Sequence, residues 1–119
     1  MHILIVENEA ELGQLWQRHL ERAGKTVTLV TDEEKALEKL HDDAFSILIL
    51  DIVLPGGSAF AVADYAAFRH PQMNILFVTR RSFFSDGSLF RHVANACAVI
   101  PAHTAPADLE AMVEHYALS

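Results

Sequence analysis

Short, largely apolar runs separated by longer amphipathic segments constrain the fold of this chain more than any other feature. The runs are rich in Ile, Leu and Val, as strands buried on both faces are. They lie at residues 3–6, 27–30, 47–50, 74–78 and 98–100. Between them, apolar residues recur at the three- and four-residue spacing of helices. The alternation predicts a parallel sheet covered by helices on both sides.

The intervening segments carry their own start and stop signals. Polar residues that cap helices, or a proline suited to a first helical turn, open four of them, and glycine or proline follows two. The predicted helices run from about Leu12 to Ala23, from Thr31 or Asp32 to Leu40, from Ser58 to Phe68, from Ser85 or Asp86 to about Asn95, and from Pro106 to Tyr116. With the strands, they predict one doubly wound α/β domain over residues 1–119.

Composition narrows the classes of function. The formal charge of −7 argues against nonspecific binding to nucleic acids, which requires basic surfaces. Cys97 is the only cysteine, so a disulfide framework and a cysteine-based zinc site are excluded. The first apolar run is too short for a signal peptide, and no apolar stretch is long enough to cross a bilayer. We therefore expect a cytoplasmic protein.

Acidic and polar residues follow the apolar runs at the point where strands end. Glu7 and Asn8 follow the first run, Asp51 follows the third, and Thr79 ends the fourth. Parallel sheets place their sites at the carboxyl ends of strands, near the switch in strand order. Carboxylate oxygens there suit a hard cation and a phosphoryl group. The sequence predicts such a site around Asp51.

Three segments resemble the receiver domain of two-component response regulators. They are Ile-Leu-Ile-Val-Glu-Asn-Glu from residue 3, Leu-Ile-Leu-Asp-Ile-Val-Leu-Pro-Gly-Gly-Ser from residue 48, and Phe-Val-Thr ending at residue 79. The likeness covers essentially the whole chain. It implies a flavodoxin-like (βα)5 fold with a five-stranded parallel sheet in the order 2-1-3-4-5.

The resemblance also assigns roles to individual residues. It implies that Asp51 accepts a phosphoryl group from the histidine of a kinase or a phosphotransfer protein. Mg²⁺ would be held by Glu7, Asn8, Asp51 and the backbone carbonyl of Val53. Thr79 would hydrogen-bond a phosphoryl oxygen. No enzymatic activity is expected beyond magnesium-dependent self-phosphorylation and self-dephosphorylation.

Two positions depart from the family pattern. Asn8 stands where a second acidic residue is usual, and it offers a carbonyl oxygen without charge. One unit charge ~4 Å away contributes roughly 4 kcal/mol at an effective dielectric of 20, before desolvation offsets it, so Mg²⁺ should bind more weakly. The lysine of the family's Lys-Pro pair is replaced by Pro101 or Ala102.

Three residues near these ends could supply the missing positive charge. Arg80 and Arg81 follow Thr79, and a guanidinium could pair with Asp51 or with phosphate. The sequence favours a simpler interpretation, a solvated basic loop. His103 could also reach the site, but an ordinary surface histidine is favoured.

The leading functional hypothesis is a stand-alone receiver that relays its signal by docking to a downstream protein. The resemblance implies a docking face built by the predicted helix at 85–95, the strand at 98–100 and the helix from residue 106. The same face could form a homodimer. No direct contact with nucleic acid or membrane is expected.

Other functions were weighed against the same residues. The first alternative is a pseudo-receiver, a protein-binding module that works without phosphorylation, and Asn8 and the missing lysine favour it. A phosphohydrolase of the haloacid dehalogenase type would carry a second aspartate where Val53 stands. A flavin-binding protein would need a phosphate-cradling loop in place of the acidic residues from Glu7 to Glu9.

Overall fold

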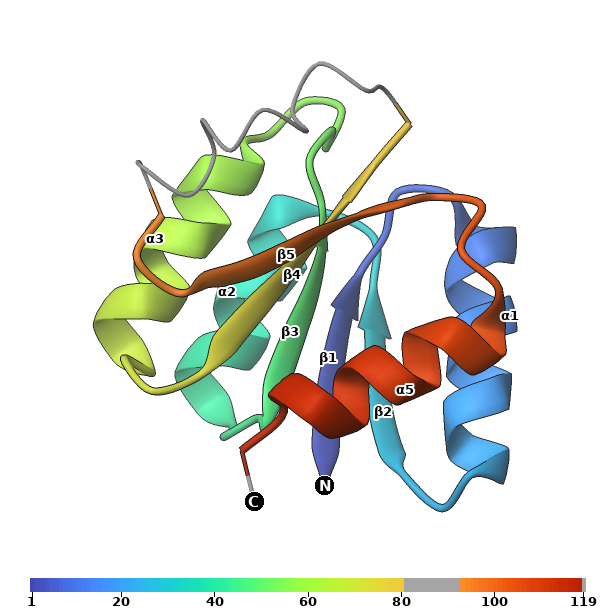
Figure 1. The fold of residues 1–119 in the computed structure, drawn as a ribbon. Coiled ribbons are helices and arrows are strands. Elements are labelled where there is room, and N and C mark those ends of the chain that lie inside the picture. The colour runs from blue at the N-terminus through green and yellow to red at the C-terminus, as the bar shows by residue number, and fades with distance from the viewer. Residues whose placement is uncertain (81–92, 119) are drawn as a thin grey trace.

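The computed structural model describes residues 1–80 and 93–118 (Figure 1). Strands and helices alternate along the chain, as the sequence predicts. The elements are β1 (His2–Val6), α1 (Ala10–Arg22), β2 (Thr26–Val30), α2 (Glu33–Asp42), β3 (Ile47–Asp51), α3 (Ala59–Arg69), β4 (Asn74–Thr79), β5 (Ala96–Pro101) and α5 (Pro106–Tyr116).

The strands of the described residues form one parallel sheet in the order β2-β1-β3-β4-β5. This order confirms the expected 2-1-3-4-5 topology. The direction of strand addition reverses between β1 and β3, where Val6 at the end of β1 pairs with Leu50, one residue before the end of β3. All carboxyl ends of the strands lie at one edge, opposite the N-terminus in Figure 1.

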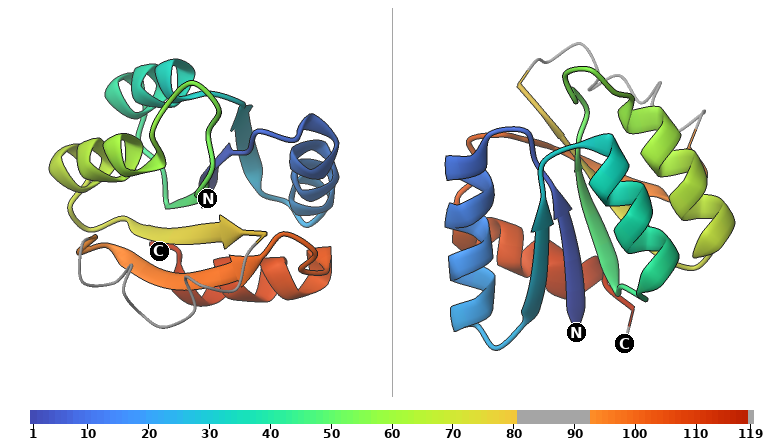
Figure 2. Two further views of the ribbon diagram at one scale, coloured as in Figure 1. Left: turned by 90° about the horizontal axis from the view of Figure 1, so that it is seen from above. Right: turned by 180° about the vertical axis from the view of Figure 1, so that it is seen from behind.

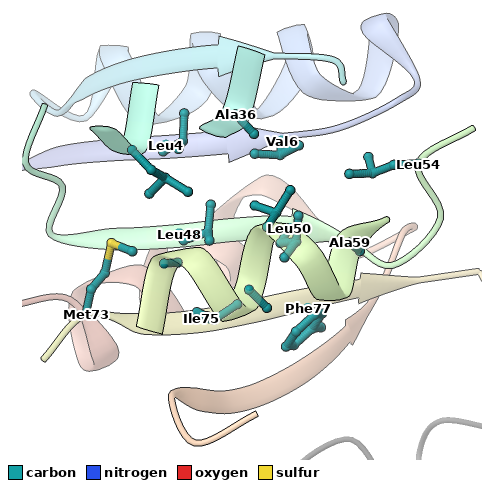
Figure 3. Close-up of a cluster of buried hydrophobic side chains, with 14 of the residues drawn as sticks. Leu4, Val6, Ala36, Leu48, Leu50, Leu54, Ala59, Met73, Ile75 and Phe77 are labelled. Carbon is teal, nitrogen blue, oxygen red and sulfur yellow. The ribbon is translucent and has the colours of Figure 1, made fainter. Parts of the chain in front are cut away.

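Helices cover both faces of the sheet, which explains why the strands are apolar throughout. α2 and α3 lie on one face, and α1 and α5 on the other (Figure 2). The core under α2 and α3 is drawn in Figure 3; its strand residues include Leu4, Val6, Leu48, Leu50, Ile75 and Phe77. The core under α1 and α5 takes the alternate strand residues Ile3, Ile5, Ile47, Ile49, Leu76 and Val78.

Among the described residues, the predicted capping residues occupy their expected places. The carboxylate of Asp32 accepts a hydrogen bond from the backbone N–H of Lys35 at 2.8 Å and so begins α2. The hydroxyl of Ser58 accepts one from the N–H of Ala61 at 3.2 Å and begins α3. Pro106 is the first residue of α5, where its missing N–H leaves no hydrogen bond unmade.

Several predicted boundaries differ from the structure. β5 is longer than the predicted 98–100, because it continues the pairing with β4 at both ends. Most of the predicted helix at 85–95 lies outside the described residues, as do Phe83 and Phe84, and the described end of that segment forms a turn at 94–95. Burial within α1 also differs from the helical pattern. Leu15 has the spacing of a buried position but is exposed, whereas its neighbour Trp16 is fully buried. Helical spacing alone overestimates the width of the buried stripe.

The described helices include none that is both long and apolar enough to cross a membrane.

Candidate functional site at the carboxyl edge of the sheet

Strand parity brings three charged side chains to the same face of the sheet. Side chains two residues apart on a strand point to the same face. Glu7 follows the buried pair Ile3 and Ile5 at this spacing, Asp51 follows Ile47 and Ile49, and Arg80 follows Leu76 and Val78. Because β1 and β4 both flank β3, Asp51 lies between the other two.

Asp51 is the last residue of β3 and is only 1% exposed. The backbone N–H of Val53 donates to its Oδ1 at 3.0 Å. The N–H of Asn8 approaches its Oδ2 at 3.4 Å. Two backbone donors from loops on either side of the strand end therefore orient this carboxylate.

The guanidinium of Arg80 is the cation of this site. Its Nη1 lies 3.3 Å from Oδ1 and 3.2 Å from Oδ2 of Asp51. Its Nη2 donates to Oε2 of Glu7 at 3.1 Å, and its Nε lies 3.4 Å from Oε1 of Glu9. The interpretation of Arg80 as a solvated loop residue is therefore wrong. Its backbone leaves β4 toward solvent, but its side chain turns back over the acidic groups.

Glu7 is buried as completely as Asp51. The N–H of Glu9 donates to its Oε2 at 2.9 Å. Its other oxygen, Oε1, is buried and has no hydrogen-bond partner among the described residues. Such an atom loses its hydration without compensation, so it favours either a proton or a cation.

The charges of the site do not balance. Burial raises the pKa of Glu7 to about 7, and the nearby carboxylate of Asp51 adds to that rise. The charge of Arg80 acts in the opposite direction without cancelling the rise. For Arg80, burial acts to lower the pKa, but the neighbouring carboxylates outweigh it and raise the pKa above its usual value. One guanidinium between two buried carboxylates leaves an excess of negative charge.

Glycines shape the turn that follows Asp51. Gly56 has a φ of 74°, in the left-handed region that side chains with a Cβ rarely adopt. A Cβ on Gly57 would lie 2.9 Å from the Cβ of Glu33, at the start of α2. The carboxylate of Glu33 accepts the backbone N–H of Ser58. The sequence indicated the turn, but it did not reveal Glu33 as the residue that anchors it.

The remaining predicted site residues lie at the same edge with different degrees of exposure. Thr79 ends β4, is half-buried, and its carbonyl accepts the N–H of Ala102 at 2.9 Å. Asn8 and the side chain of Val53 are exposed. His103 is exposed, as the sequence favoured. Arg81 lies outside the described residues.

No lysine stands at the end of β5. Its last residues are Ile100, which is buried, and Pro101, which pairs with Thr79. The positive charge of the described site comes instead from the end of β4, the neighbouring strand. The alternation of side chains along a strand could have predicted the position of Arg80. Arg80 lies an even number of residues after Leu76 and Val78, which share a face of the sheet with Asp51.

The donor set fits a magnesium ion that retains water. Mg²⁺ in proteins is bound through one or two carboxylates together with water and phosphate oxygens. Within the described ranges, no group of three or more His, Cys, Asp or Glu residues is placed to hold a metal. The buried carboxylates of Glu7 and Asp51 supply the one or two acidic ligands that Mg²⁺ needs. The unpartnered Oε1 of Glu7 is an oxygen available to bind it.

Comparison with known sequences gives a family. A family model for the response regulator receiver domain matches residues 3–114. The uncharacterized transcriptional regulatory protein YrkP of Bacillus subtilis is 36% identical over 84 residues, which cover 71% of this chain and 36% of YrkP. The response regulator receiver protein CpdR of Brucella abortus is 32% identical over 77 residues, or 65% of this chain and 64% of CpdR.

Solved structures share the fold. A CheY-like response regulator receiver domain protein from Methanospirillum hungatei superposes with a TM-score of 0.87 at 24% identity, covering 96% of this chain and 90% of that chain. The response regulator TrrA from Thermotoga maritima, in complex with Mg²⁺ and BeF, gives a TM-score of 0.83 at 23% identity and covers 97% of each chain.

The matched proteins are regulators, and several are longer than this chain. The chain spans about a third of the length of the first curated relatives that it matches, 36% and 37%. Because that model covers residues 3–114 and the strand order agrees, the chain belongs to the response regulator receiver domain family of two-component signalling.

Proposed function

We propose that this receiver domain accepts a phosphoryl group on Asp51. The observation that carries the proposal is the pair of buried carboxylates, Glu7 and Asp51, at the carboxyl edge of the sheet. Asp51 is held there by the N–H groups of Val53 and Asn8. A carboxylate fixed beside a second acid is suited to attack a phosphorus atom when a cation offsets their charge.

The transfer follows from the position of Asp51. One of its carboxylate oxygens attacks the phosphorus of a phosphohistidine, and a P–O bond forms as the P–N bond breaks. The electron pair of the broken bond returns to the imidazole nitrogen of the donor. The Val53 N–H, which donates to Oδ1, holds the carboxylate in position. The hydroxyl of Thr79, at the end of the adjacent strand, would donate to a phosphoryl oxygen.

The residues that would hold Mg²⁺ are Glu7, Asn8, Asp51 and the backbone carbonyl of Val53. When bound, the ion offsets the negative charge that the carboxylate and the incoming phosphoryl group bring together. Glu7 contributes the buried, unpartnered Oε1, and Asn8 contributes a neutral amide oxygen. The presence of Mg²⁺ and BeF in the TrrA structure supports this assignment by likeness of fold.

The partners follow from the same chemistry. The phosphoryl donor would be a histidine kinase or a histidine-containing phosphotransfer protein, and the signal would pass to a downstream protein by docking. The relatives named transcriptional regulators are longer than this chain. We propose that the domain relays its signal as a stand-alone receiver. The edge strand β5 and α5 would form part of its docking face. The proposal includes no direct contact with nucleic acid or membrane.

One observation favours the pseudo-receiver as a second candidate. Asp51 is 1% exposed, and both of its oxygens lie within 3.3 Å of the Arg80 guanidinium. An arginine that stayed in this place would block the path of a phosphoryl donor to the carboxylate. The domain would then act as a protein-binding module whose buried carboxylates stay paired with its own Arg80.

Reaction with acetyl phosphate and Mg²⁺, read by intact mass, separates the two candidates. The wild-type protein should gain one phosphoryl group, and Asp51→Asn should gain none. Asp64→Asn is the matched control, because Asp64 is an exposed acid on α3. An increment that persists in Asp51→Asn would assign the phosphoryl group to another residue. The absence of any increment in the wild-type protein would favour the pseudo-receiver.

A further inference from the structure

We propose that Arg80 is a built-in competitor of the divalent cation: its guanidinium holds Glu7 and Asp51 together at rest, and Mg²⁺ binds only when this side chain leaves them. The inference rests on the magnesium site of the proposed function but does not depend on phosphoryl transfer. It gives Arg80 a role different from that of the family's lysine, because the arginine occupies the place of the metal.

The contacts of Arg80 show that it binds as a cation between two ligands. Nη1 faces both oxygens of Asp51, and Nη2 faces Oε2 of Glu7, all within 3.1 to 3.3 Å. The two carboxylates are each 1% exposed, so little water competes for them. The planar guanidinium fork spans two acids in a way that a lysine ammonium cannot. Arg80 thus contacts both acidic groups on which a magnesium ion would depend and leaves only Oε1 of Glu7 without a partner.

Charge makes simultaneous occupancy unfavourable. Glu7 and Asp51 carry at most two negative charges, which Mg²⁺ alone would neutralise. If the guanidinium stayed between them, three positive charges would face the two negative charges of these buried carboxylates, because Glu9, the third carboxylate near Arg80, is 59% exposed and its charge is screened by water. Like charges at such short range repel strongly when the effective dielectric is low. Binding of the metal therefore requires the guanidinium to move.

The structure gives the side chain a place to go. Arg80 itself is about a third exposed, with 34% of its side chain accessible to solvent. Its Nε already lies 3.4 Å from Oε1 of Glu9, whose side chain is 59% exposed. The backbone just before it is fixed, because the carbonyl of Thr79 accepts the N–H of Ala102. A rotation about side-chain bonds toward Glu9 would therefore clear the buried carboxylates without moving β4.

The competition predicts that removing Arg80 strengthens metal binding. A site whose competent state is only partly populated binds its ligand more weakly in proportion to that population. We expect Arg80→Gln to bind Mg²⁺ about tenfold more tightly than the wild-type protein, or better. Arg80→Lys keeps the charge but loses the fork, so its affinity should lie between the two.

Isothermal titration of the metal-free protein with MgCl2 is the test. Arg18→Gln is the matched control, because it removes one positive charge from an exposed position on α1 and should leave the affinity unchanged. Tighter binding by Arg80→Gln than by the wild-type protein and this control supports the competition. Equal or weaker binding by Arg80→Gln overturns it and leaves the proposed magnesium site intact. If neither protein binds Mg²⁺, the magnesium site is wrong and the inference fails with it.

Thermal unfolding gives a second measurement that does not depend on a calorimetric signal. Without metal, Arg80→Gln leaves two buried carboxylates facing one another, so its Tm should fall below that of the wild-type protein. Saturating MgCl2 should raise the Tm of Arg80→Gln more than that of the wild-type protein, since tighter ligand binding to the folded state stabilises it further. If Arg80→Gln does not fold, Arg80→Lys is measured in its place. An equal rise in the variant and the wild-type protein contradicts the inference.

Discussion

Arg80 and Glu7, separated by 73 positions in the sequence, pair at 3.1 Å between Nη2 and Oε2. The pair joins the ends of β1 and β4, which do not contact each other directly because β3 lies between them. It therefore closes the edge of the sheet over Asp51. Arg80, which directly follows the fourth strand, therefore supplies the positive charge of the described site, and no lysine stands at the end of the fifth strand.

The Arg80–Glu7 pair should stabilise the metal-free protein. In EDTA, we expect Arg80→Gln to lower the free energy of unfolding by about 1–2 kcal/mol, less than for a fully buried pair because Arg80 is a third exposed. The double variant with Glu7→Gln should recover part of this loss, since the unpaired carboxylate is then gone. Chemical denaturation of the four proteins gives the coupling energy. A coupling of zero would mean that the two residues do not interact in solution.

Stability of the metal-free protein should depend on pH through Glu7. Burial raises the pKa of Glu7 from 4.5 in the unfolded chain to about 7 in the folded protein. Between these two pH values, Glu7 keeps its proton in the folded protein and has lost it in the unfolded chain. This contribution is fully present below pH 4.5 and is lost as pH rises through about 7. The free energy of unfolding should fall by at most about 3 kcal/mol over this window. Denaturation series from pH 4.5 to 8 should show the fall in the wild-type protein and a smaller one in Glu7→Gln.

Replacing Gly56 by a residue with a Cβ should destabilise the protein because of its left-handed backbone conformation, and not because of a steric clash. Its φ is 74°, and a Cβ there would meet nothing within 4 Å. We expect Gly56→Ala to lower the free energy of unfolding by about 1 kcal/mol, the cost of the left-handed conformation. Gly56→Asn should cost less, because asparagine tolerates that conformation. Equal losses in urea denaturation of the two variants would point to another cause.

Cys97 should react slowly with thiol reagents. It is half-buried on β5, and burial raises the pKa of its thiol to about 11. The raised pKa keeps the thiol protonated at pH 8, and only the thiolate is nucleophilic. Alkylation by iodoacetamide should be at least ~100-fold slower in the folded protein than in urea. Because Cys97 is the only cysteine, intact mass reports its modification directly; similar rates in both states would show that the thiol is not protected.

The sequence determined the fold because the relevant signals are local. Continuous apolar runs such as 47–50 predict strands buried on both sides, and Asp32, Ser58 and Pro106 mark helix starts through contacts with residues close in the chain. Asp51 and Glu7 could be placed at one edge without any structure, since parallel strands end together. The strand order came from resemblance to a family, and the structure confirmed it.

Only the tertiary structure decided what those acids contact. The partner of Glu7 and Asp51 depends on the register of β3 against β4 and on a side-chain conformation of Arg80, and neither is a local property. Reasoning from neighbouring residues alone therefore predicted that the Arg80 side chain would lie in solvent. The raised pKa of Glu7 has the same origin, because it results from burial by distant segments. The sequence thus specifies which groups reach the edge of the sheet, and packing determines which charges meet there.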